Sequence, residues 1–315
     1  MFDQERNPLW VERFRPAEVK DCILPGDLKA TFQQFVDAGS IPNMTLVGGA
    51  GCGKTTVAKA MLDELNCDYI VINGSLNGNI DTLRNEIQQF ASSVSLTGGR
   101  KYVILDEADG LNPSSTMPAL RNFIEQYSRN CGFILTANFA GKIIEPLKSR
   151  CPIIEMKFKK SDMPHLATEF FKRAQGILSA EGVEYETPAL AGVIGKYMPD
   201  WRRVLGELQR YGASGKIDAG ILTNIQNVSI VGLVKMMKEK RFSDIRKWVA
   251  ENLDSDSNAI FRTFYDTASE YLDAPGQAQL ILLIAKYSYQ AAFSVDHEIC
   301  VMAFLTECMI ELEYK

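Results

Sequence analysis

Histidine is scarce in this chain, and its cysteines are never spaced as metal ligands usually are. The 315 residues include two histidines and seven cysteines, and no two cysteines form a C-x-x-C pair. Structural zinc sites need clustered cysteine and histidine ligands, so we do not expect one. The odd, scattered cysteines also argue against a disulfide framework. We therefore predict seven free thiols, most of them buried.

Long apolar stretches are also missing. Runs such as LILLIA at 280–285 are far too short to span a bilayer. The first ten residues, MFDQERNPLW, lack the apolar segment of a secretory signal. We therefore expect a cytoplasmic protein.

A basic excess is missing as well, because the formal net charge is −5. Free-standing nucleic-acid-binding proteins usually carry such an excess. Any contact with DNA or RNA would therefore need a local basic patch, or a surface formed by several copies of the chain.

The first half of the chain has a regular alternation of strand and helix patterns. Five apolar, β-rich runs are expected to be strands, at 44–48, 69–73, 102–106, 133–137 and 152–156. Helical periodicity lies between them, for example at 54–65 and 80–93. Strands that alternate with helices form a parallel sheet with helices on both faces. We therefore predict an α/β domain over residues 1–157, built on a parallel five-stranded sheet with flanking helices.

Only helical patterning follows the last predicted strand. The residues SDMP at 161–164 predict a helix start, with Ser161 or Asp162 as the N-cap. The final segment, at 297–314, is apolar on most of its circumference and needs burial on several sides. We predict a helical domain over residues 158–226 and a second all-α domain over residues 227–315.

A phosphate-binding loop follows the first predicted strand. Gly48, Gly53, Lys54 and Thr55 match the pattern G-x-x-x-x-G-K-[ST]. Glycines let backbone N–H groups wrap a phosphate, and the helix that follows points its positive dipole end at the same anion. Lys54 is expected to reach the phosphates of ATP, and Thr55 to hold Mg²⁺. The predicted loop contacts are Gly51, Cys52, Gly53, Lys54, Thr55 and Thr56.

The third predicted strand delivers two carboxylates. In YVILDEADG, residues 102–110, a buried strand ends at Asp106 and Glu107, at the sheet edge where open α/β sheets bind ligands. Asp106 is expected to hold Mg²⁺, and Glu107 to orient or deprotonate the attacking water. Ala108 and Asp109 complete the word D-E-A-D, which names a family of RNA helicases, and we assign them no chemistry.

The rest of the chain does not support a helicase of that kind. Such a helicase also needs an S-A-T motif and an H-R-x-G-R-type motif, and neither is present. Each of the two histidines is followed by a residue other than arginine, as His165-Leu166 and His297-Glu298. The chain therefore contains a P-loop ATPase site, and other motifs must identify the class of P-loop ATPase to which it belongs.

Four further motifs point to one family. Asn138 ends the strand GFILTAN, beside the carboxylates, and residues 149–151 form the triplet S-R-C. WRRVLGELQRY at 201–211 and LWVERFRP at 9–16 complete the set. These motifs and their order along the chain resemble those of AAA+ ATPase subunits of sliding-clamp loaders. The resemblance covers about the first 210 residues. The resemblance is greatest to the large subunit of T-even bacteriophage clamp loaders, then to replication factor C small subunits.

The resemblance implies an AAA+ module, a helical lid and an all-α collar used for oligomerisation. Asn138 would be sensor 1, touching the γ-phosphate and the attacking water. Arg150 would act as an arginine finger on the nucleotide of the neighbouring subunit. Arg202, or failing that Arg203, would contact phosphates from the lid. The N-terminal contacts over the adenine would be Val11, Glu12, Arg13, Phe14 and Ile23.

The resemblance also implies partners. These are a sliding clamp, the other subunits of a ring-like assembly (expected to be pentameric, with several copies of this chain) and primer-template DNA, bound without sequence specificity. ATP hydrolysis stimulated by DNA would then place the clamp on DNA during replication. If a phage encodes the chain, the compartment would be the host cytoplasm.

The DNA contacts implied by the resemblance lie near the starts of two helices. Asn79 and Arg84 belong to one, and Ser114 and Ser115 to the other. Helix N-termini suit backbone phosphates and carry no sequence information. Asn79 would also relay DNA binding to Glu107. The alternative is that Asn79 and the serines are ordinary N-caps and Arg84 a solvated charge.

The chain departs from the family in its phosphate loop. Gly49 and Ala50 replace the usual proline pair, and Cys52 replaces a threonine, which suggests a site sensitive to oxidation. Two other classes of function stay open: a different AAA+ DNA machine (helicase loader, initiator or branch-migration ATPase) and a non-enzymatic assembly subunit. The S-R-C triplet disfavours the first, and the intact Lys54, Glu107 and Arg150 disfavour the second.

Overall fold

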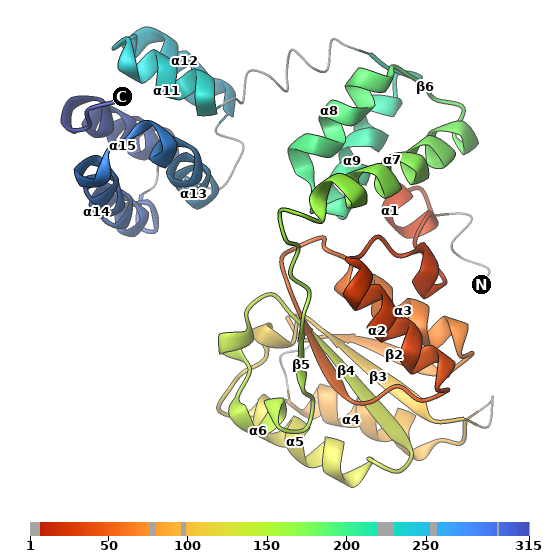
Figure 1. Cartoon of the computed structure of the whole chain (residues 1–315). Helices are drawn as coiled ribbons and strands as arrows, with labels where there is room; N and C mark the ends of the chain where they lie inside the picture. Colours follow the sequence, from red (N-terminus) through yellow and green to blue (C-terminus); the bar gives the residue numbers. More distant parts are fainter. Residues whose placement is uncertain are drawn as a thin grey trace. The chain divides into compact units, whose positions relative to one another are not determined.

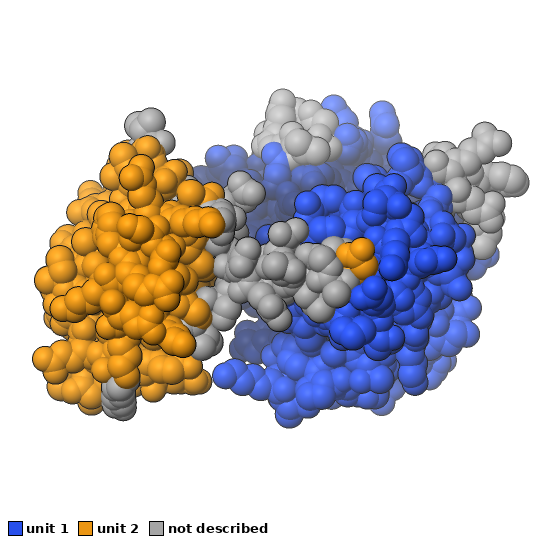
Figure 2. Space-filling model, turned by 90° about the horizontal axis from the view of Figure 1, so that it is seen from above, with its two compact units in different colours: residues 1–217 blue, residues 218–315 orange. Residues whose placement is uncertain are grey.

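The computed structural model describes residues 7–75, 80–95, 99–218, 230–252, 257–294 and 296–314. The chain divides into two compact units, Met1–Ile217 and Asp218–Lys315 (Figure 2). Our predicted boundary at 157/158 falls within the first unit, between its last large-sheet strand and the next helix. The boundary predicted at 226/227 lies outside the described residues.

The first unit is built on the predicted parallel sheet of five strands. They are β1 (Met44–Val47), β2 (Tyr69–Asn73), β3 (Lys101–Asp106), β4 (Cys131–Ala137) and β5 (Ile153–Glu155). Their order is β2-β3-β4-β1-β5, and every neighbouring pair is parallel. The carboxyl ends of β3, β4 and β1 therefore lie side by side. The loop after β1 and the residues after β3 and β4 meet at one edge of the sheet.

Helices cover both faces of this sheet, because alternate strand residues point to opposite sides (Figure 1). Tyr102, Ile104 and Ile134 pack in a buried cluster with α2 (Gly26–Asp37) and α3 (Lys54–Glu64). Val103, Leu105, Phe133 and Leu135 pack in a second cluster on the other face. That face is covered by α4 (Ile80–Ser92), α5 (Thr116–Gln126) and α6 (Glu145–Lys148). Short 3₁₀ turns lie at η1 (Val19–Asp21), η2 (Ala108–Gly110) and η3 (Ala140–Lys142).

Three helices follow the sheet and complete the first unit: α7 (Met163–Ala180), α8 (Thr187–Tyr197) and α9 (Trp201–Gly212). Asp162 occupies the N-cap position of α7 as predicted, but its side chain caps no backbone N–H. Two short strands lie between these helices and after them: β6 (Glu184–Tyr185) pairs in parallel with β7 (Lys216–Ile217). Our prediction of only helices in this region is corrected by this two-residue pairing, which is too short to produce a strand pattern in the sequence.

The N-terminal segment is tied to these helices. It forms a short helix, α1 (Trp10–Arg13), which lies beside α9 (Figure 1). The Trp10 backbone N–H donates to Gln209 Oε1 over 3.0 Å, and the indole Nε1 donates to Glu181 Oε2 over 3.1 Å. These two hydrogen bonds connect the N-terminal segment to α9 and to the residue that follows α7.

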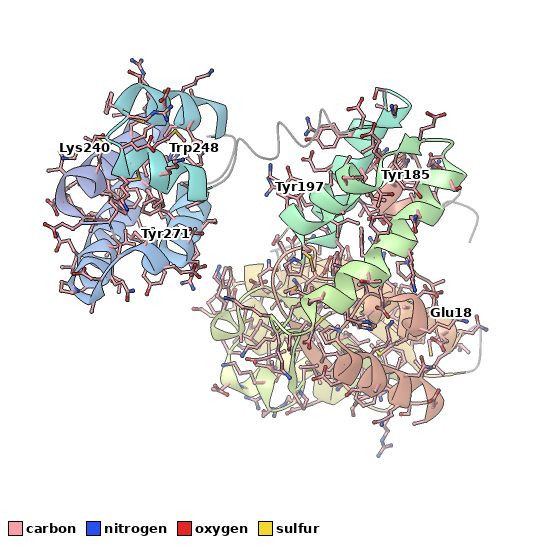
Figure 3. All side chains as sticks on the ribbon, turned by 45° about the horizontal axis from the view of Figure 1, so that its top comes forward. Glu18, Tyr185, Tyr197, Lys240, Trp248 and Tyr271 are labelled. Carbon is pink, nitrogen blue, oxygen red and sulfur yellow. The ribbon has the colours of Figure 1, made fainter. Side chains whose placement is uncertain are left out.

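The second unit is entirely helical in its described part. It contains α11 (Ile230–Lys238), α12 (Phe242–Asn252), α13 (Ser257–Ala268), η4 (Ser269–Tyr271), α14 (Ala274–Ala291) and α15 (His297–Glu311). Three edge-to-face phenylalanines, Phe261, Phe264 and Phe304, form its centre, and Trp248 and Tyr271 belong to the same cluster (Figure 3). The unit buries only part of α15, because Ile299 and Ile310 are 67% and 75% exposed. No helix in the described part of the chain is long and apolar enough to cross a membrane.

Candidate nucleotide-binding site

One cavity lies at the carboxyl edge of the sheet and gathers residues from five separate parts of the first unit. The N-terminal segment, the phosphate loop, the ends of β3 and β4 and the lid helices all contribute to it. Its lining residues are Val11, Phe14, Arg15, Pro16, Cys22, Ile23, Leu24, residues 50–56, Asp106, Glu107, Thr136, Ala137, Asn138, Phe170, Arg173, Trp201, Arg202 and Leu205. This one cavity therefore contains nearly all the residues that we expected to touch ATP.

The phosphate loop takes the backbone shape that its glycines allow. Gly51 and Gly53 have φ values of +65° and +96°, which side chains with a Cβ rarely adopt. A Cβ on Gly51 would stand 1.7 Å from Asp200 Oδ1, so glycine is also required by the close approach of the lid. Helix α3 starts directly after Gly53 and points its N-terminus at the cavity. Together these features provide N–H groups and a helix dipole for an anion.

Lys54 is 9% exposed, and neighbouring groups fix its position. Its Nζ donates to the carbonyl oxygens of Gly48 and Gly49, over 2.8 and 2.7 Å, and to Asn138 Oδ1 over 2.9 Å. The ammonium group is therefore held between the phosphate loop and the end of β4. Asn138 contacts it directly, as a side chain at the sensor-1 position can when β4 and β1 are neighbours.

Asp106 forms the centre of an oxygen cluster. Its Oδ1 accepts from Thr55 Oγ1 and from Thr136 Oγ1, each over 2.6 Å. A hydroxyl beside a carboxylate is a donor set that suits Mg²⁺, which prefers hard oxygen ligands. Thr55 and Asp106 therefore fit the metal that we predicted for them. Thr136 was missed, although it is a hydroxyl-bearing residue inside the largely apolar strand β4.

Glu107 follows in an unusual backbone conformation. Its φ and ψ are 54° and 45°, in the left-handed region that costs a residue other than glycine roughly 1–3 kcal/mol. Its backbone N–H donates to Thr136 Oγ1 over 3.1 Å. The side chain is exposed and lines the cavity. Strain of this kind is typical of functional positions, and here it turns the carboxylate out of the sheet toward the cavity.

The N-terminal segment reaches the cavity with some, but not all, of the predicted residues. Val11, Phe14 and Ile23 line it. Glu12 and Arg13 are not among its lining residues, so their contact with the nucleotide stays a prediction. Glu12 Oε2 accepts from Arg15 Nε over 3.3 Å, while Arg13 forms an ion pair with Glu181 of the lid. Arg15, Pro16, Cys22 and Leu24 line the cavity instead.

The lid contributes two cations, Arg202 and Arg173, and a stacked aromatic pair, Phe170 and Trp201. Arg202 lines the cavity, whereas the guanidinium of Arg203 lies 4.8 Å from the ring centre of Tyr197, at the end of α8 (Figure 3). The geometry thus favours Arg202 over Arg203 as the lid contact. Arg173 also lines the cavity and was missed. Its guanidinium donates to Phe14 O over 2.6 Å and to Asp21 O over 3.1 Å, and burial lowers its pKa.

Comparison with known proteins decides the family. The family model "ATPase family associated with various cellular activities (AAA)" matches residues 44–158. The model "Sliding-clamp-loader large subunit, AAA+ ATPase lid domain" matches residues 162–223. The sliding-clamp-loader large subunit of Escherichia phage RB69 is 32% identical over 96% of this chain and 96% of its own length. The chain belongs to the sliding-clamp-loader family of AAA+ ATPases.

Other relatives agree with the family. The sliding-clamp-loader large subunit of Enterobacteria phage T4 is 34% identical over 77% of each chain. The replication factor C small subunit of Methanosphaera stadtmanae is 29% identical over 97% of this chain and 91% of its own. Our resemblance to phage clamp loaders and replication factor C is therefore confirmed. Among solved structures, the Thermotoga maritima RuvB branch migration motor has a TM-score of 0.53 at 21% identity, covering 68% of this chain and 74% of its own, which shows the fold alone.

Arg150, which we predicted to be an arginine finger, lies outside the cavity. Its Nε donates to Glu125 Oε1 over 2.7 Å, and its Nη1 donates to Pro146 O over 2.9 Å. The hydrogen bond from Arg150 lowers the pKa of the Glu125 carboxyl. The side chain is partly exposed. Arg150 therefore does not complete the nucleotide site of its own chain.

The predicted DNA contacts are described only in part. Asn79 lies outside the described residues. Arg84 is exposed, with its guanidinium 6.0 Å from the ring centre of Phe123. Ser114 and Ser115 are exposed, and their backbone N–H groups donate to Asn112 Oδ1 over 2.8 and 3.2 Å. Ser115 precedes α5 without a capping bond from its side chain, so its hydroxyl is not used as an N-cap.

Cys52 is too enclosed to act as an oxidation switch. All seven cysteines are free, and six are buried. Cys52 is 2% exposed, and burial raises the pKa of its thiol above its usual value. Because the thiolate is the reactive form, both features slow oxidation. Our suggestion that the substitution makes the site sensitive to oxidation is therefore disfavoured.

We expect peroxide to inactivate the ATPase of wild type and of Cys52→Thr at the same rate. The measurement is residual ATP hydrolysis after timed peroxide exposure. Cys67→Ser is the matched control, because Cys67 is the one cysteine of the described residues that is not buried. Clear protection by Cys52→Thr, without protection by Cys67→Ser, would show that the buried thiol is reactive after all.

Proposed function

We propose that this chain is the ATPase subunit of a sliding-clamp loader, which uses ATP binding and DNA-stimulated hydrolysis to open a ring-shaped clamp and place it on primer-template DNA. The observation that carries the proposal is a divided site. Lys54, Asp106 and Glu107 share one cavity, whereas Arg150 lies on the surface outside it. In such a divided site, a second copy or a partner subunit would supply the arginine.

Within the cavity, each residue has a chemical task in hydrolysis. The loop N–H groups and Lys54 bind the phosphates, and Arg202 adds charge from the lid. The Thr55 hydroxyl and the Asp106 carboxylate would hold Mg²⁺, whose charge would offset that of the phosphates. Glu107 accepts a proton from the attacking water, and Asn138 orients that water toward the γ-phosphate. The products are ADP and phosphate.

Arg150 completes the site from the neighbouring subunit. In the ring-like, pentameric assembly that we propose, its guanidinium leaves Glu125 and stabilises charge on the transferred phosphoryl group. The exposed isoleucines of α15 suit a role of the second unit in holding the assembly together. Hydrolysis is then limited to copies that have a correctly seated neighbour.

We propose that DNA binds near the starts of α4 and α5. Arg84, Ser114 and Ser115 are exposed there, and we propose that they and Asn79 contact backbone phosphates. Because the net charge of one chain is −5, the basic surface must arise where several copies converge. Binding should therefore weaken steeply as salt is raised.

The test is ATP hydrolysis by the assembly purified with its partner subunits, with and without the sliding clamp and primed DNA. We expect low hydrolysis alone and strong stimulation when clamp and primed DNA are both present. A rate that is already maximal for the isolated chain would contradict the proposal. Stimulation by DNA but never by any clamp would favour a different AAA+ DNA machine.

A further inference from the structure

Asp109, the last letter of D-E-A-D, contacts the end of the neighbouring strand. Its Oδ2 accepts from the backbone N–H groups of Asn138 and Phe139, over 3.2 and 3.3 Å. These two residues follow directly on β4, where the sheet hydrogen bonds stop. A single carboxylate oxygen therefore fixes the backbone of the residue whose side chain contacts Lys54.

The turn that carries Asp109 has little freedom. It is the 3₁₀ turn η2, which starts directly after the strained Glu107. The Gly110 N–H donates to Glu107 O over 2.9 Å, and Ala108 is fully buried. The position of the Asp109 carboxylate is thus set by the same few backbone angles that set the position of Glu107.

Two side-chain contacts join the ends of β3 and β4, one at Glu107 itself and one two residues later, at Asp109. At the first, the Glu107 N–H donates to Thr136 Oγ1. At the second, Asp109 accepts from Asn138 and Phe139. Asp109 itself does not line the cavity, so we expect it to make no contact with the nucleotide.

We propose that Asp109 is a positioning residue that holds Asn138 at a fixed distance from Glu107 during hydrolysis. The inference rests on the proposed ATPase function, since both residues act there on the attacking water. Without the carboxylate, Lys54 and the phosphate loop are unchanged, so ATP still binds. The backbone N–H groups of Asn138 and Phe139 lose the side-chain acceptor that the structure describes for them. The loop after β4 then shifts, and Asn138 moves relative to Glu107.

The predicted result is a separation of turnover from binding. Because misplacement by about 1 Å can cost roughly 100-fold in rate, Asp109→Ala should lower the kcat of the assembly by about 10- to 100-fold. The Kd for a fluorescent ATP analogue should stay within about twofold, since no nucleotide contact is lost. Asp109→Asn, whose amide oxygen can accept the same two N–H bonds, should recover most of the rate.

The experiment measures kcat with primed DNA and clamp, the Kd for the ATP analogue, and the melting temperature. Asp37→Ala, an exposed aspartate on α2, is the control for loss of one carboxylate. If Asp109→Ala does not fold, Asp109→Glu is judged by the same criteria, because it keeps the charge but moves the oxygen by one methylene. An unchanged kcat, or parallel losses of kcat, ATP affinity and melting temperature without recovery in Asp109→Asn, would overturn the inference.

The wild-type assembly separates this inference from the proposed function. If wild type shows no hydrolysis stimulated by primed DNA and clamp, the proposed function fails, whatever the variants do. If wild type is stimulated and Asp109→Ala turns over equally fast, the role of Asp109 alone is wrong.

Discussion

Glu107→Gln is expected to lower ATP hydrolysis by the assembly about 100- to 10,000-fold while ATP stays bound. Glutamine has the same size and fits the same left-handed backbone position, which Thr136 holds through the Glu107 N–H. Its amide cannot accept a proton from water. The phosphate loop, Lys54 and Asp106 are untouched, so the ATP affinity should change little.

The measurement combines phosphate release with ATP binding to the assembly on primed DNA. Glu155→Gln is the matched control, because Glu155 lies at the end of β5 in the same sheet. It pairs with Lys157 and does not line the cavity. Glu155→Gln should therefore hydrolyse ATP at the wild-type rate. Hydrolysis by Glu107→Gln at that same rate would show that another group activates the water.

Arg150→Ala is expected to reduce DNA-stimulated hydrolysis about 1,000-fold, as removal of an arginine finger does elsewhere. The Kd for ATP should stay within about twofold, because Arg150 does not line the cavity of its own chain. Within its own chain it contacts Glu125 and Pro146 at the surface, so its loss should cost little stability.

Arg262→Ala is the control for removal of a surface arginine that is paired with a carboxylate. Arg262 lies 3.3 Å from Asp266 in the second unit and is equally uninvolved in its own nucleotide cavity. It should leave hydrolysis unchanged. If Arg150→Ala weakens ATP binding and hydrolysis together, the arginine acts on its own chain and the divided site is wrong.

The parts of the fold that the sequence predicts are those with a local signal. The strands were found because apolar β-rich runs stand between helical periods, and the phosphate loop because its glycines and Lys54 are contiguous. The pairing of β6 with β7 was missed, because two residues carry no period. The contacts of Glu12 with Arg15 and of Arg13 with Glu181 were not predicted, because they depend on packing.

The missed site residues have a common cause. Thr136, Arg173 and Asp109 each act on residues far away in sequence, through strand order or lid packing. Asp109 is the clearest case. The sequence presents it as the end of a four-letter word, and only the pairing of β3 with β4 shows what its carboxylate binds. Signals of this kind require the register of the sheet.

The divided site is tested most directly by mixing two inactive variants and asking whether ATP hydrolysis is restored. Lys54→Ala lacks the phosphate-binding ammonium but keeps Arg150, and Arg150→Ala keeps Lys54. When both are assembled together with the partner subunits, some neighbouring copies pair an intact cavity with an intact arginine. We predict that these mixed assemblies hydrolyse ATP on primed DNA while neither variant alone does. The double variant mixed with Arg150→Ala should stay inactive. Mixed single-variant assemblies that remain as inactive as either parent would contradict the proposal that neighbouring subunits share one site.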